Sequence, residues 1–143
     1  MEHFARVMQV LLVEDSEADI RLTREALKEV QLPTNLHVVR DGEAAMEFLH
    51  AQAPRPDLIL LDLNLPKKDG REVLSEIKSE ASLKVIPVVI LTTSGADVDI
   101  NNSYQLHANC YIQKPLDLDR FLEILQSIKH FWLTIVNLPP ARV

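Results

Sequence analysis

The chain has 143 residues, 47% of them hydrophobic and 25% charged, and a formal net charge of −6. This length fits a single domain with a substantial core, and the composition is that of an ordinary globular protein. The acidic balance and the scattered basic residues argue against direct binding to DNA or RNA. Cys110 is the only cysteine, which excludes an internal disulfide. No stretch reaches the roughly 18 consecutive apolar residues of a membrane span, and residues 1–7 lack the apolar region of a signal peptide, so a cytoplasmic protein is expected.

The first predicted element is a buried strand over residues 8–13 (MQVLLV), an apolar run rich in residues that favour strands. A helix is predicted directly after it, because Ser16 followed by Asp19 resembles a capping box. Residues 31–33 (QLP) end this helix. Its inward-facing side chains are expected at helical spacing, at Ile20, Thr23, Leu27 and Val30.

The same alternation of short apolar strands and helices continues along the chain. It implies right-handed crossovers and a parallel sheet with helices on both faces, so the fold class is α/β, doubly wound. In such sheets the ligand site lies beyond the carboxyl ends of the strands, near the point where the strand order reverses. The remaining predicted strands are residues 36–39, 57–61, 88–91 and 111–113, and the remaining helices are 42–50, 71–79, 96–107 and 118–131.

Polar residues follow four of the predicted strands: Glu14 and Asp15, then Asp62, Thr92 and Lys114. Any one of them could simply belong to a polar loop. Three carboxylates at one sheet edge, however, repel one another unless a cation neutralises them. Oxygen ligands without histidine or thiol favour Mg²⁺, which commonly shares its site with a phosphate. Thr92 and Lys114 would then offer a hydroxyl donor and a cation to a phosphoryl group.

Residues 62–70 (DLNLPKKDG) form a short polar loop after the third strand. Asn64 could lend its main-chain carbonyl to the metal, and Gly70 is expected to let the chain turn sharply. Lys67 and Lys68 are either a solvated part of this loop or contacts for a kinase. Neither a GxGxxG nor a GxxxxGK[ST] motif is present, so a nucleotide site is not indicated.

Taken together, these motifs resemble the receiver domain of two-component response regulators. The resemblance rests on Glu14-Asp15, on Asp62 within LLDLNLPKKDG, on Thr92 within PVVILTTS and on Lys114-Pro115. It implies a flavodoxin-like, five-stranded parallel sheet of order 2-1-3-4-5 over residues 8–131.

The resemblance also implies roles for individual residues. Asp62 would accept a phosphoryl group from a phosphohistidine of a sensor kinase, and Lys114 would pair first with this acceptor and then with the phosphate. Mg²⁺ would be held by Asp15, Asp62 and the main-chain carbonyl of Asn64, with Glu14 acting mostly through a metal-bound water. Thr92 and Tyr111 would form the switch, although Tyr111 could equally be an ordinary strand residue.

More narrowly, the NLPKKDGREVL, LTTS and FWLTIVNLPP segments are similar to the small response regulators paired with cyanobacterial phytochromes. The implied protein is a single-domain response regulator, not an enzyme, whose partner is a phytochrome-type histidine kinase. One alternative is a Mg²⁺-dependent phosphohydrolase with an aspartate nucleophile, which Asn64 disfavours because such enzymes usually carry a second acidic residue at that position. The other is a pseudo-receiver that only binds proteins, which the intact set of polar strand-end residues disfavours.

Residues 132–143 are predicted as an apolar C-terminal extension of the receiver. In the last helix Leu118, Leu122 and Leu125 are expected to face the sheet, which leaves a second apolar stripe for another chain. This stripe and the extension are expected to form a homodimer interface or to dock the kinase, with the homodimer favoured. The interface residues are Ile124, Ile128, Phe131, Trp132 and Ile135.

Overall fold

The computed structural model describes residues 7–51, 54–92, 110–114 and 118–137, except for the side chains of Thr92 and residues 133–137. In these residues five strands form one sheet with the order β2-β1-β3-β4-β5, and every neighbouring pair is parallel. This confirms the predicted sheet and its strand order. The strands are β1 (Met8–Val13), β2 (Thr34–Val39), β3 (Leu58–Asp62), β4 (Val88–Thr92) and β5 (Cys110–Gln113).

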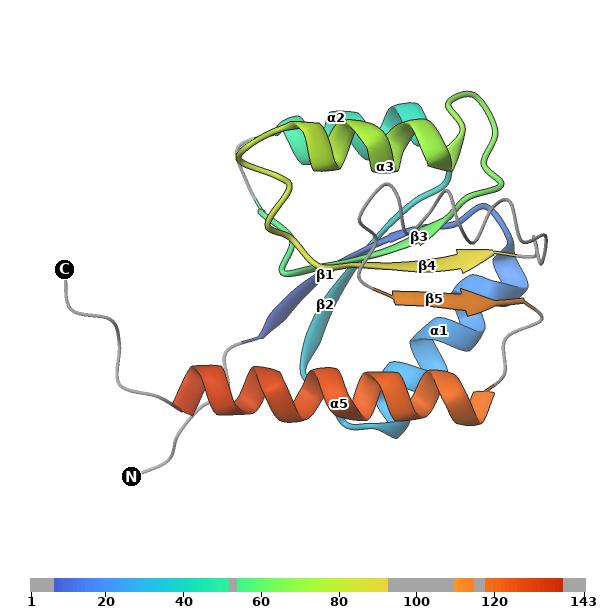
Figure 1. Ribbon diagram of the computed structural model, residues 1–143. Helices are drawn as coiled ribbons and strands as arrows, with labels where there is room; N and C mark the ends of the chain where they lie inside the picture. Colours follow the sequence, from blue (N-terminus) through green and yellow to red (C-terminus); the bar gives the residue numbers. More distant parts are fainter. Residues whose placement is uncertain (1–6, 52–53, 93–109, 115–117, 138–143) are drawn as a thin grey trace, which may run out of the picture.

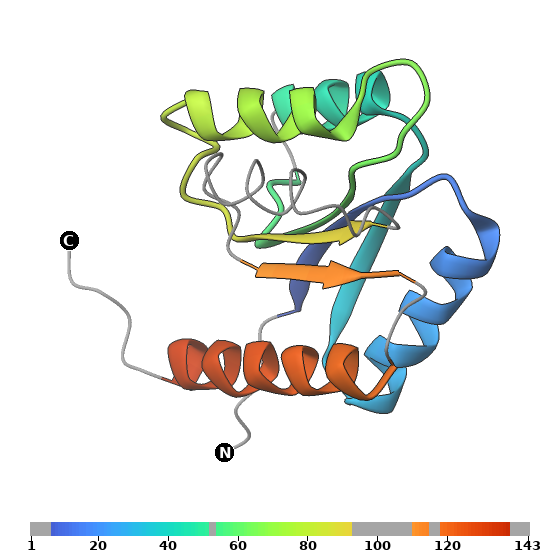
Figure 2. The ribbon, with the colours of Figure 1, turned by 45° about the vertical axis from the view of Figure 1, so that its right-hand side comes forward.

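Helices cover both faces of the sheet (Figure 1, Figure 2). Helices α1 (Glu17–Glu29) and α5 (Leu118–Asn137) lie on one face, and α2 (Gly42–His50) and α3 (Gly70–Ser79) lie on the other. Each face has its own apolar cluster, and because strand side chains alternate between the two faces, β1 and β3 contribute to both. The predicted helix 96–107 lies outside the described residues.

Some elements have the predicted bounds, and others differ, in part because long-range strand pairing decides where they begin and end. Strand β1 and helix α2 have the predicted bounds. Strand β2 begins at Thr34, earlier than predicted, because Thr34 and Asn35 pair with the first residues of β1. Strand β3 includes Asp62, which pairs with Leu91, and excludes Asp57, whose carboxylate accepts a hydrogen bond from the Gln9 N–H at 2.8 Å.

Helix α5 differs most from its prediction. It continues to Asn137, past the predicted end at residue 131. Phe121 and Leu125 are fully buried against the sheet, whereas Leu118, expected to face the sheet, is 43% exposed. The larger Phe121 ring, one turn further along, fills the core at this end of the helix. Among the described helices, none has the length and apolar character that a membrane span needs.

The C-terminal end of α1 is closed by a Schellman motif. The Leu32 N–H donates to the Leu27 carbonyl at 3.3 Å, and the Gln31 N–H donates to the Lys28 carbonyl at 3.0 Å. Gln31 has a positive φ of 57°, the left-handed conformation that glycine usually supplies at this position. Helix α5 also contributes, because Lys129 Nζ donates to the Val30 carbonyl at 2.8 Å.

Replacing Gln31 by glycine should therefore raise the free energy of unfolding by about 0.5–1 kcal/mol, because the left-handed backbone costs glycine nothing sterically. Urea denaturation monitored by circular dichroism measures the change. Gln31→Ala is the matched control, since it removes the side-chain atoms beyond Cβ and keeps the Cβ that causes the backbone strain. Equal stabilisation by both variants would contradict this explanation.

Candidate functional site

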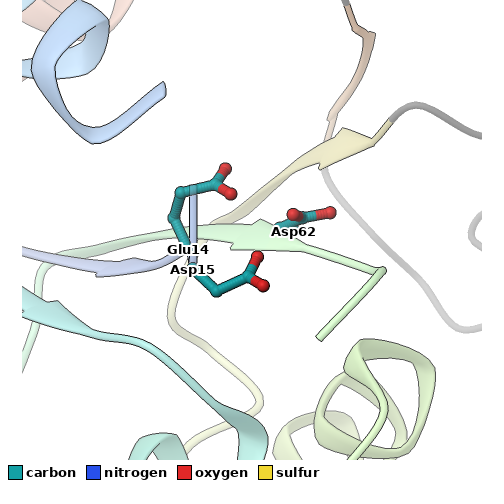
Figure 3. Close-up of side chains that lie close together, drawn as sticks. All are labelled: Glu14, Asp15 and Asp62. Atoms are coloured by element: carbon teal, nitrogen blue, oxygen red, sulfur yellow. The ribbon is translucent and has the colours of Figure 1, made fainter. Parts of the chain in front are cut away.

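Three carboxylates meet where the carboxyl ends of β1 and β3 lie side by side. Glu14 and Asp15 directly follow β1, Asp62 is the last residue of β3, and the strand order reverses between these two strands. Figure 3 shows the three side chains extending into the same space beyond the strand ends. One carboxylate oxygen from each lies within 4.8 Å of the others. Glu14 and Asp62 are buried, and Asp15 is exposed at the opening.

A buried ammonium group joins this cluster from β5. Lys114, the residue after that strand, places its Nζ 2.6 Å from Glu14 Oε1, 2.7 Å from Asp19 Oδ2 and 3.2 Å from Asp62 Oδ2. Burial by itself lowers the pKa of Lys114, but the bonds to Asp19 and Glu14 and the charge of Asp62 outweigh it and raise this pKa. Lys114 is therefore a permanent cation in the pocket.

The cluster is still short of positive charge. The pKa of Glu14 is raised to about 7, because burial and the charge of Asp62 raise it and the hydrogen bond from Lys114 only partly offsets this rise. One ammonium thus leaves the buried carboxylates incompletely neutralised. Because the donors are oxygens and Asp15 opens to solvent, a hard divalent cation that keeps several waters fits them.

The loop after β3 orients the Asp62 carboxylate through a backbone hydrogen bond. The Asn64 N–H donates to Asp62 Oδ1 at 2.9 Å, and the Gly70 N–H donates to the Leu63 carbonyl at 3.0 Å. Gly70 does not have a positive φ, so its backbone conformation does not require glycine. The expectation that glycine is needed here to let the chain turn sharply therefore gives the wrong reason. Glycine is needed for space, because an added Cβ would lie 2.4 Å from the Asp62 carbonyl oxygen and 2.5 Å from Leu63 Cα.

Replacing Gly70 by alanine should destabilise the protein by about 1–3 kcal/mol, because backbone atoms of β3 must move to admit the methyl group. The same movement displaces Asp62. Thermal unfolding measures the loss of stability, and the NMR signal of the Asn64 backbone amide, which donates to Asp62, reports the displacement. Glu72→Ala, an exposed position in the first turn of α3, is the control. Wild-type stability in Gly70→Ala would mean that this backbone relaxes without cost.

The other predicted residues of the switch lie on the neighbouring strands. Thr92 is the last residue of β4, and its side chain lies outside the described residues. Tyr111 is half-buried in β5 and packs against the apolar cluster under α2 and α3. The two lysines of the loop after β3 both have acidic partners. Lys67, with a positive φ of 66°, places its Nζ 3.7 Å from Asp41 Oδ2, and Lys68 forms an ion pair with Glu76. Roles of these residues in switching or docking stay predictions.

The predicted interface residues of α5 fall into two groups. Ile124 and Ile128 are half-buried and pack against the cluster under α1 and α5, and Trp132 is a buried member of that cluster. Phe131, by contrast, is 65% exposed. The side chain of Ile135 lies outside the described residues.

Asp19 is the residue of the pocket that the sequence interpretation missed. Ser16 caps α1 by accepting a hydrogen bond from the Asp19 N–H at 3.3 Å, as predicted. In a full capping box the Asp19 side chain would in turn accept from the Ser16 N–H. Here the Ser16 N–H donates to Glu14 Oε2 at 3.1 Å instead, and the Asp19 carboxylate pairs with Lys114. A capping box normally has the longer Glu or Gln at this position. The shorter aspartate was therefore the one sign in the sequence that this side chain has a partner other than the cap.

Comparison with known proteins agrees with this geometry. The family model described as "Response regulator receiver domain" matches residues 10–126. Response regulator Rcp1 of Synechocystis is 55% identical over 137 residues, covering 92% of this chain and 93% of that protein. The crystal structure of the phosphorylated cyanobacterial phytochrome response regulator RcpA superimposes with a TM-score of 0.79 at 53% identity, covering 94% of this chain and 100% of that one. The Mn²⁺-bound form of Rcp1 gives a TM-score of 0.77 at 54% identity, covering 93% and 99%. The chain therefore belongs to the response regulator receiver family.

Proposed function

We propose that this response regulator accepts a phosphoryl group on Asp62 from the phosphohistidine of a sensor histidine kinase. The observation that carries the proposal is the buried Asp62 carboxylate, with Glu14 and Asp15 beside it and the Lys114 ammonium 3.2 Å from its Oδ2. A carboxylate oxygen of Asp62 forms the new bond to phosphorus while the bond to the histidine nitrogen breaks. The electron pair stays on that nitrogen, which takes up a proton.

The surrounding residues prepare this transfer. The Asn64 N–H fixes one oxygen of Asp62, and Lys114 offers a positive charge where phosphoryl oxygens arrive. Thr92, at the end of β4, is proposed to donate its hydroxyl to the phosphate, and Tyr111 to respond by turning inward. Mg²⁺ is proposed as the metal, held by Asp15, Asp62 and the Asn64 main-chain carbonyl, with Glu14 acting through a water. When bound, it would neutralise charge on the transferring group.

The proposed kinase is of the phytochrome type. Support comes from the 55% identity to Rcp1 and from the 53% identity to RcpA, a cyanobacterial phytochrome response regulator. We assign the receiver to residues 8–131 and a C-terminal extension to 132–143, and we place the protein in the cytoplasm, where the kinase is phosphorylated from ATP.

Transfer of label from a phosphorylated phytochrome kinase tests this function. The chain should become labelled in the presence of Mg²⁺, up to one phosphoryl group per molecule, and the bond should break in base as acyl phosphates do. Chelation of the metal should prevent labelling. Repeated turnover of small phosphate esters would instead favour a phosphohydrolase. No transfer, under conditions in which the same kinase labels another receiver, would favour a pseudo-receiver.

We further propose that the apolar surface of α5 joins two copies of the chain. Phe131 is 65% exposed, and Ile124 and Ile128 are half-buried beside it. An exposed phenylalanine next to partly covered isoleucines suits a contact with an identical surface.

Phe131→Lys should therefore convert a dimer into a monomer, because two buried ammonium groups would face each other in a symmetric interface. Light scattering coupled to size exclusion measures the mass. Val85→Lys is the control, since Val85 is 70% exposed and lies outside α5. An unchanged mass for Phe131→Lys would contradict dimerisation through this surface. A truncation after His130 is less informative, because it also removes the buried Trp132.

A further inference from the structure

The ammonium of Lys114 has as many carboxylate partners as it has N–H donors. A lysine ammonium carries three donors, and Glu14, Asp19 and Asp62 each place an oxygen within ion-pair distance of it. The contacts are unequal. Glu14 and Asp19 lie at 2.6 and 2.7 Å, whereas the proposed acceptor Asp62 lies at 3.2 Å. The two shorter contacts are thus made by residues that do not receive the phosphoryl group.

Asp19 reaches Lys114 from a different element than the other two carboxylates. It stands in the first turn of α1, where the helix dipole stabilises a negative charge, and its own N–H is bonded to Ser16 Oγ. Its main chain is therefore fixed by the cap while its carboxylate points to Lys114. Glu14 approaches the ammonium from the end of β1, so the two anchors hold it from the sheet and from the helix.

We propose, on the basis of the function proposed above, that Asp19 is a positioning residue for phosphoryl transfer. Together with Glu14 it occupies two of the three N–H donors of Lys114, so that the third points at Asp62 Oδ2. When phosphorus bonds to Asp62, a phosphoryl oxygen replaces Asp62 as the third acceptor. Because the ammonium is already oriented, this exchange requires no rotation of Lys114 during the reaction.

Three variants separate this role from a general effect of charge or folding. Asp19→Ala removes the anchor, and Asp19→Asn keeps an oxygen acceptor at the same place. Glu17→Ala is the matched control: Glu17 is another carboxylate in the first turn of α1, but it is exposed and pairs with Arg40 at 3.0 Å. The loss of helix-terminal charge is the same in Asp19→Ala and Glu17→Ala.

The first measurement does not depend on phosphorylation. In ¹H–¹⁵N spectra of lysine NH₃⁺ groups, the buried Lys114 should give a signal that exchanges slowly with water and disappears in Lys114→Arg. Asp19→Ala should broaden or lose this signal, and Glu17→Ala should keep it. An unchanged Lys114 signal in Asp19→Ala would overturn the proposal, whatever the outcome for the proposed function.

The second measurement is the rate of transfer from the phosphorylated kinase at saturating Mg²⁺. Asp19→Ala should slow transfer by about tenfold through misplacement of the ammonium, and Asp19→Asn should recover most of the rate. Glu17→Ala should react like the wild type. The proposal is overturned if Asp19→Ala reacts at the wild-type rate, if Asp19→Asn is no faster than Asp19→Ala, or if Glu17→Ala is equally slow. If the wild type itself takes no label, the proposed function fails and the spectra still decide the anchoring of Lys114.

Discussion

Asp62→Asn is expected to take up no label from a phosphorylated kinase while remaining folded. The amide offers no anionic oxygen to attack phosphorus, so transfer should fall to background. The same change removes one of the buried negative charges beside Glu14, which carries a raised pKa partly because of Asp62. In the absence of Mg²⁺ the variant should therefore be at least as stable as the wild type. Phosphotransfer assays and urea denaturation measure the two properties on the same preparation.

A control for this variant lies at the opposite end of the same strand. Asp57 directly precedes β3, and its carboxylate accepts a hydrogen bond from the Gln9 N–H at 2.8 Å, an interaction that the oxygen of an asparagine can keep. Asp57→Asn should be labelled like the wild type. Undiminished labelling of Asp62→Asn would mean that another residue is the acceptor.

Lys114→Met should be the most destabilising single change in the pocket. Methionine has a similar length but no charge, so Glu14 and Asp62 would be left buried without their cation. Removing one partner of a buried ion pair costs about 3–5 kcal/mol. Urea denaturation without divalent metal should show a loss of this size, and Lys84→Met, at an exposed lysine, should show almost none. Mg²⁺ should restore more stability to Lys114→Met than it adds to the wild type, because it supplies the missing positive charge.

The pH dependence of this loss follows from Glu14. The pKa of Glu14 is raised from 4.5 to about 7 mainly by burial, and it would be higher without the hydrogen bond from Lys114, so losing the lysine raises this pKa further. Between the ordinary and the raised pKa, the folded state holds a proton that the unfolded state has lost, and stability falls as the pH rises through this window. The deficit of Lys114→Met should therefore be larger at about pH 8 than at about pH 5.5. A deficit independent of pH would assign the loss to packing instead of charge.

Much of the fold is encoded locally and was predictable from the sequence. The buried run of β1 and the Asp41-capped helix α2 have bounds that patterning and capping determine by themselves. What sequence patterns do not contain is the pairing of distant segments. Strand β2 begins at Thr34 because β1 lies beside it, and the exposure of Leu118 depends on the fit of Phe121 to the sheet.

The site divides in the same way. Glu14, Asp15, Asp62 and Lys114 were predictable because parallel strands bring their carboxyl ends to one edge. The contact of Asp19 with Lys114 was not, because it joins residues 95 positions apart and the local cap accounts for Asp19 equally well. The need for glycine at position 70 depends likewise on the distance to the β3 backbone, which no spacing in the sequence reveals.

The bond from Lys129 to the end of α1 has a mechanical consequence. Lys114 holds the first turn of α1 through Asp19, and Lys129 holds the last turn through the Val30 carbonyl at 2.8 Å. Helix α1 is thus fastened at both ends by lysines that precede or belong to α5. A tilt of α1 at one end would strain the bond at the other end, so we expect α1 and α5 to move together relative to the sheet.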